Sequence, residues 1–140
     1  MRRSFTAAVL ALLLGLGSAP AGAATGERVR ITGEVIDTWC YVTEIMYALG
    51  TAHHRCAVWC AIGGIPVSIL AEDGTVYVVL KVEGDADLVA DERIVSFQTH
   101  EVVVEGDHYV RDGVNYLIVT QVADDNGIVN INHEDFGIQP

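Results

Sequence analysis

Three cysteines and one histidine have the residue types and the spacing of a metal site. The chain has only three cysteines, Cys40, Cys56 and Cys60, and His53 precedes the last two. On a helix, positions 53, 56 and 60 share one face, whereas His54 is rotated by roughly 100° and points elsewhere. Three thiolates and one imidazole suit tetrahedral zinc, and thiolates with imidazole also suit cuprous copper. The spacing therefore predicts a copper or zinc site with four ligands, Cys40, His53, Cys56 and Cys60.

Two other roles for the cysteines are open. In an oxidising compartment the common fate of cysteines is a disulfide, and three allow one bond and one free thiol. Residues one helical turn apart keep their Cβ atoms about 5–6 Å apart, so a bond between Cys56 and Cys60 is disfavoured and Cys40 would be one partner. Such a staple would make the protein a disulfide-stabilised module that binds a protein partner.

The remaining role is thiol redox chemistry, the only catalytic option with support in the chain. Arg55 and the start of a helix would favour a thiolate at Cys56. However, the spacing is not Cys-x-x-Cys, and no βαβ pattern surrounds it. We therefore expect a non-enzymatic accessory or carrier protein.

Several further side chains are candidates for supporting roles. Met46 would supply a thioether to copper, or it packs as an apolar residue of the loop. Asp37 would orient His53 from the second shell, or it caps the end of a strand. Three other histidines are expected to be ordinary strand or loop residues: His100, His108 and His133. Of these, His133 could also form a weak cation site with the carboxylates at 134 and 135.

Residues 1–23 have the pattern of a secretory signal peptide. A basic start at Arg2 and Arg3 precedes an apolar run over 7–16, and small residues occupy 21–23. An uncleaved membrane anchor is the alternative. Cleavage leaves one domain, residues 24–140, in the periplasm or outside the cell.

The chain is strongly acidic, with a net charge of −11, and all of its Asp and Glu residues follow residue 23. This charge repels phosphate backbones and anionic lipid surfaces. We therefore expect no nucleic acid and, after signal cleavage, no membrane as a partner. A cation or a basic protein is the better candidate.

The residue pattern after position 23 predicts a mainly β domain. Arg28–Asp37 alternates apolar and polar residues, and Asp-Gly steps at 73–74 and 112–113 predict tight hairpin turns. The predicted strands cover 28–37, 65–70, 75–82, 94–105, 108–110 and 114–122. Glu105-Gly106-Asp107 predicts a further turn. A short helix is expected over 85–92, and a short strand or loop from Asp124.

One longer helix is expected between the first two strands, over residues 51–62. Thr51 would cap its start, and Gly63-Gly64 would end it, because glycine adopts positive φ without strain. This helix would carry His53 and two of the cysteines toward Cys40, at the end of the first strand.

The pattern resembles a group of small secreted bacterial proteins with an oligonucleotide/oligosaccharide-binding (OB)-like barrel. The matching segments are a strand that ends in Asp37-x-x-Cys40, the motif His53-x-x-Cys56-x-x-x-Cys60, and a hairpin around Asp73-Gly74. The resemblance covers roughly residues 33–77. It implies a five-stranded barrel that holds the cysteine cluster as one unit, and it implies no activity.

Overall fold

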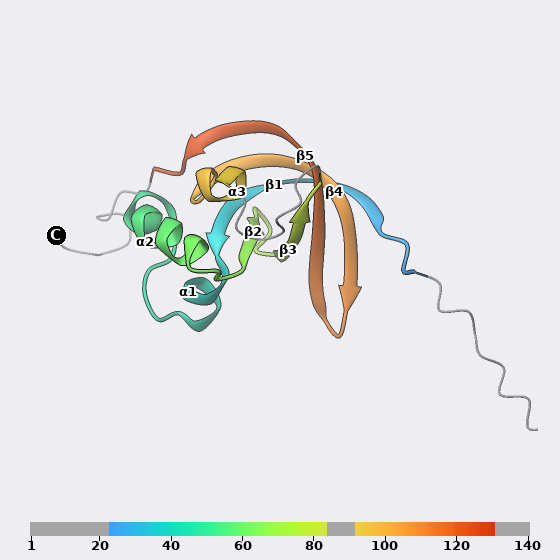
Figure 1. The fold of residues 1–140 in the computed structure, drawn as a ribbon, viewed down its shortest axis with the longest axis horizontal. Coiled ribbons are helices and arrows are strands. Elements are labelled where there is room, and N and C mark those ends of the chain that lie inside the picture. Colours follow the sequence, from blue (N-terminus) through green and yellow to red (C-terminus); the bar gives the residue numbers. More distant parts are fainter. Residues whose placement is uncertain (1–22, 84–91, 131–140) are drawn as a thin grey trace, which may run out of the picture.

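The structure, a computed structural model, describes residues 23–83 and 92–130 of the chain (Figure 1). Its elements in chain order are β1 (Glu27–Asp37), α1 (Thr38–Thr43), α2 (Gly50–Ile62), β2 (Val67–Ala71), β3 (Val76–Val82), α3 (Glu92–Ser96), β4 (His100–Arg111) and β5 (Val114–Ile128). The predicted signal peptide up to residue 22 and His133 lie outside the described residues. The same holds for the helix predicted over 85–92, except that its last residue begins α3.

The five strands form one mainly antiparallel sheet that closes into a ring in the order β1-β2-β3-β5-β4. β1 closes the ring, because it pairs with β2 on one side and β4 on the other. The pairing of β3 with β5 is the parallel one. The prediction of a mainly β chain is therefore confirmed, and both predicted Asp-Gly turns join neighbouring strands.

Alternation along β1 places its apolar residues in the core, as predicted. Ile31 and Val35 are buried, whereas Arg28 and Arg30 are exposed. Matching inward-facing residues of the other strands, together with one residue each of α2 and α3, complete the core: Val67, Ile69, Val79, Val102, Val104, Leu117, Val119, Ala61 and Ile94. The end of β1 is buried on both faces, because Ile36 is fully covered as well. α1 and α2 both contact β1 there, at one end of the ring (Figure 1).

The connection between β1 and β2 differs from the prediction, because it holds two helices instead of one. The first strand stops at Asp37, and Cys40 belongs to α1 rather than to a strand end. α2 begins at Gly50, with Leu49 in the capping position, so Thr51 is not the cap. It ends as expected, since Gly64 has a φ of 89°.

Three predictions for the second half of the chain differ from the structure. Residues 94–96 belong to α3, and β4 begins only at His100. β4 then runs without a break through the turn predicted at 105–107, and β5 continues to Ile128, past Asp124. Gly106 is needed for a different reason: a Cβ there would collide with the carbonyl oxygen of Ile118 on β5. The glycine permits close approach of two strands.

Replacing Gly106 by alanine should therefore destabilise the ring. The added Cβ must push β5 away or distort the pairing, and we expect a loss of about 1–3 kcal/mol in unfolding free energy. Val110→Ala is the matched control on the same strand, because Val110 is 64% exposed. Urea unfolding of both variants measures the difference; equal stability would contradict the close-approach role.

Candidate metal centre

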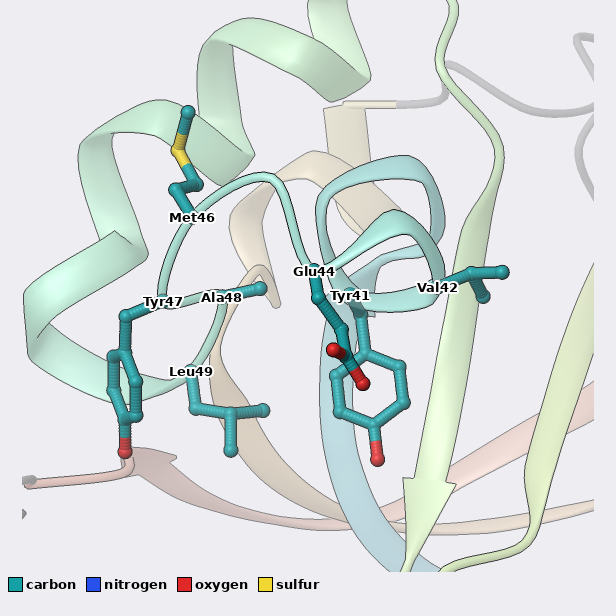
Figure 2. Close-up of a pocket in the computed structure, with 7 residues that line it drawn as sticks. All are labelled: Tyr41, Val42, Glu44, Met46, Tyr47, Ala48 and Leu49. Atoms are coloured by element: carbon teal, nitrogen blue, oxygen red, sulfur yellow. The ribbon is translucent and has the colours of Figure 1, made fainter.

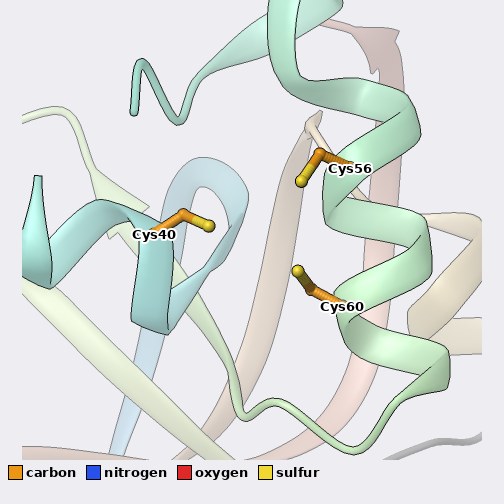
Figure 3. Close-up of side chains that lie close together, drawn as sticks. All are labelled: Cys40, Cys56 and Cys60. Atoms are coloured by element: carbon orange, nitrogen blue, oxygen red, sulfur yellow. The ribbon is translucent and has the colours of Figure 1, made fainter. Parts of the chain in front are cut away.

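All three cysteines of the chain converge between α1 and α2. Figure 3 shows Cys40 of α1 pointing toward Cys56 and Cys60, which project from successive turns of α2. The three Sγ atoms all lie within 4.8 Å of one another. All three are free thiols; Cys40 is buried, and the two cysteines of α2 are partly exposed. The predicted gathering of the cysteines is therefore present.

Asp37 positions the first cysteine. It is the last residue of β1, and its Oδ1 accepts a hydrogen bond of 3.1 Å from the backbone N–H of Cys40. This side chain caps α1, satisfying a backbone donor that the start of a helix leaves unpaired. The next residue is held from the other side, because the Thr38 N–H donates to the carbonyl oxygen of Pro66 at 3.1 Å. These two hydrogen bonds hold the start of α1, and with it Cys40, next to the end of β1 and the start of β2.

Glu34, also on β1, positions the second helix. Its Oε1 accepts a 2.6 Å hydrogen bond from the backbone N–H of Gly50, the first residue of α2. Burial, together with the nearby Glu101 carboxylate, raises the pKa of Glu34 to about 7, although the Gly50 N–H opposes the shift. Both helices of the centre thus depend on carboxylates of β1, three residues apart.

His53 is more buried than the two cysteines of α2, and it belongs to a second group. The side chain is 2% exposed, and its Nε2 is 3.6 Å from Asp37 Oδ2. Asp37, Cys40 and His53 have ligand atoms within 4.8 Å of one another, but no such group among the described residues holds all four predicted ligands. The structure thus divides the predicted set into two groups that share Cys40. Asp37, weighed from the sequence as either a cap or a partner of His53, occupies both positions.

The two buried polar atoms between these groups lack ordinary partners. Neither Asp37 Oδ2 nor His53 Nε2 makes a hydrogen bond of good geometry within the described part of the chain. Buried polar atoms usually have such a partner, because the loss of hydration is costly. Both atoms belong to the group that Asp37 and His53 form with Cys40.

His54 is directed elsewhere, as its rotation on the helix predicts. Its Nδ1 lies 2.8 Å from Thr99 Oγ1 and 3.1 Å from the carbonyl oxygen of Gln98, both between α3 and β4. The two described histidines of the sheet have polar partners of their own: His100 pairs with Asp125, and His108 with Asn115. These interactions fit structural roles for all three.

The carboxylate of Asp37 contributes to raised pKa values at two of the three thiols. Burial and the interaction with Asp37 raise the pKa of Cys40 to about 11. The interaction with Asp37, followed by burial, also raises the pKa of Cys60 well above its ordinary value. Burial acts to raise the pKa of Asp37 itself, but its interactions with both cysteines outweigh this and lower it. At neutral pH Cys40 and Cys60 are therefore protonated beside an ionised carboxylate.

A fourth sulfur lies at the edge of the cluster. The Sδ of Met46 is 3.8 Å from the Sγ of Cys56. Met46 belongs to the loop that joins α1 to α2, and it lines a surface pocket with other residues of α1 and this loop (Figure 2). The sequence marks Met46 as a candidate ligand by its type alone; nothing in the local pattern shows that the loop folds back onto α2.

No family model matches this chain, and no curated protein or solved structure was found to be similar to it.

The pKa of Glu34 makes the anchoring of α2 depend on pH. A group whose pKa is higher in the folded state contributes stability at pH values below its ordinary pKa, and that stability is lost as pH rises through the folded value. The wild type should thus lose stability between about pH 5 and 8 relative to Glu34→Gln, whose amide oxygen still accepts from Gly50 without ionising. Melting temperatures at both pH values test this; a difference between the two proteins that does not change with pH would contradict it.

Removing the charge of Asp37 should make Cys60 more reactive. Asp37→Asn keeps an oxygen that can cap α1 but removes the carboxylate that raises the pKa of Cys60. The thiolate fraction at pH 8–9 should therefore increase, and with it the rate of alkylation. Mass spectrometry of the reduced, metal-free protein after timed exposure to iodoacetamide measures each cysteine separately. Asp73→Asn, in an exposed turn, is the control, and a rate at Cys60 unchanged from wild type would show that Asp37 does not set its charge.

Proposed function

We propose that the protein is a secreted or periplasmic metal-binding accessory or carrier protein, and that its cargo is a thiophilic ion, copper or zinc. The observation that carries this proposal is the convergence of every cysteine of the chain, all unpaired, from two separate helices. Thiols have no packing reason to gather in this way, whereas thiolates are the preferred ligands of these ions. Thiol redox chemistry remains the alternative that the free thiols also permit.

The spacing of the sulfurs suits a single ion. Ligands about 2.3 Å from a tetrahedral metal lie about 3.8 Å from one another, which is inside the 4.8 Å limit that the three Sγ atoms satisfy. Binding would exchange the thiol protons for the ion. The positive charge of the ion would also offset the negative charges of the thiolates and of the nearby Asp37 carboxylate.

The fourth coordination position adjoins two candidate side chains. His53, the ligand predicted from the sequence, approaches from the buried side through the group it forms with Cys40 and Asp37. Met46 approaches from the solvent side, next to Cys56. A site closed by the imidazole would suit structural zinc, whereas a site open toward solvent suits an ion that is exchanged.

Features around the centre support delivery rather than permanent storage. Large apolar side chains are exposed on α1, on the loop to α2 and on α2 itself: Trp39, Val42, Ile45, Trp59 and Ile62. Apolar residues exposed together on a soluble protein often serve recognition. With the net charge of −11, they favour a partner protein that combines an apolar contact with a basic surface.

We further propose that the closed sheet is a barrel of the OB type and that the N-terminal segment directs export. Five strands in one ring support the first proposal. In OB-folds, ligands commonly bind at the loop between the first two strands, and here α1 and α2 occupy this connection. None of the helices in the described part of the chain is long and apolar enough to cross a bilayer.

Metal titration of the reduced protein under anaerobic conditions tests the proposal. The wild type should bind one ion per chain, and each of Cys40→Ser, Cys56→Ser and Cys60→Ser should weaken binding by at least about tenfold. His108→Ala should leave affinity unchanged, because this histidine is bonded to Asn115 on the sheet. If the cysteine variants bind as the wild type does, or the wild type binds no ion, the carrier role is wrong; a disulfide through Cys40 in the isolated protein would instead select the stapled module.

A further inference from the structure

Met46 occupies a position that packing does not explain. It is 46% exposed, and its neighbour Ile45 is 58% exposed, so neither is buried under the loop. A methionine placed for hydrophobic stabilisation would cover its thioether. The sulfur of this side chain instead lies 3.8 Å from that of Cys56, on the helix that carries two of the thiols.

The distance between the two sulfur atoms is that of two ligands of one metal. Ligand atoms about 2.3 Å from a tetrahedral ion are separated by about 3.8 Å. Met46 Sδ and Cys56 Sγ are separated by 3.8 Å, and Cys56 Sγ lies within 4.8 Å of the other two sulfurs. Met46 is therefore adjacent to one sulfur of a three-sulfur cluster, at a separation that one shared ion would require.

We propose that Met46 is the fourth ligand of the centre and that the four sulfurs, from Cys40, Cys56, Cys60 and Met46, hold monovalent copper. This inference rests on the proposed metal-binding function and names the ion. A thioether is a soft, neutral donor that suits cuprous copper, whereas zinc is typically completed by imidazole, thiolate or carboxylate. His53, the imidazole nearest the cluster, does not form one group with Cys56 and Cys60.

His53 then has a supporting role on the buried side. Its Nε2 faces Asp37 Oδ2, and Asp37 holds the N–H of Cys40. The imidazole thus acts on the copper ligand Cys40 through the carboxylate, as second-shell partners of metal ligands commonly do.

Ligation by Met46 also provides the route by which copper leaves. The thioether is the one neutral ligand and also the one on a solvent-facing loop, so it is the ligand most readily replaced. It lines the surface pocket with Tyr41, Val42, Glu44 and Tyr47, which is open to an approaching donor (Figure 2). An incoming thiol or thioether could take the position of Met46 while the three cysteines remain in place.

Substitution of Met46 tests its part in binding. Met46→Leu preserves volume and removes the sulfur, and it should weaken cuprous copper binding by about tenfold or more while zinc affinity stays within about twofold. Ile45→Leu, on the neighbouring exposed residue, should change neither. Anaerobic competition against a copper(I) chelator and a zinc chelator measures both affinities, and thermal melts verify that the variants fold. Equal copper affinity in wild type and Met46→Leu would overturn the assignment.

X-ray absorption at the selenium edge tests the bond itself. The chain has only two methionines, Met1 and Met46, so a selenium–copper signal that is lost in labelled Met46→Leu arises from Met46. The copper-loaded protein should show copper at roughly 2.3–2.5 Å from selenium, and labelled Met46→Leu, which keeps Met1, should not. Copper bound without this signal would refute Met46 as a ligand and leave the proposed function standing; failure to bind either metal would refute both.

Discussion

The strand-to-helix junction at Asp37 is the constraint on which the centre depends. One carboxylate ends β1, caps α1 through the N–H of Cys40, faces the imidazole of His53 and raises the pKa of Cys60. Asp37 is paired with Val67 of β2, so movement of this junction would break the pairing of β1 with β2. The sheet therefore fixes the carboxylate, and the carboxylate fixes the first cysteine relative to α2.

Burying the ionised carboxylate of Asp37 beside the thiols costs folding free energy, because the charge loses hydration. The stability of the ring comes from its apolar interior, to which Asp37, His53 and the thiols of α2 do not belong. Their arrangement instead holds Cys40 and Cys60, whose pKa values are raised, beside an ionised carboxylate.

Local chemistry made part of this structure predictable. The Asp73-Gly74 and Asp112-Gly113 turns and the glycines after α2 act through their own backbone preferences, so each was found from neighbouring residues alone. Gly106 was misread because the same residue type serves a turn or a close approach of strands. Only the position of β5 distinguishes the two.

The candidate site shows the same limit. Helical spacing placed His53, Cys56 and Cys60 on one face of α2, but it could not give their depth, and the histidine is more buried than these two cysteines. α1 was missed because six residues after a strand leave too short a pattern to recognise. The approach of Met46 to Cys56 depends on how the loop between the helices folds, which no local signal records.

The most direct test of the central claim is the metal and thiol content of the protein as it is made by its own cell. Protein isolated anaerobically, without added chelator or reductant, would be examined by elemental analysis and by counting free thiols after denaturation in a chelator. The account predicts one thiophilic ion per chain, three thiols and no disulfide. A metal-free protein with one disulfide and one thiol would contradict it.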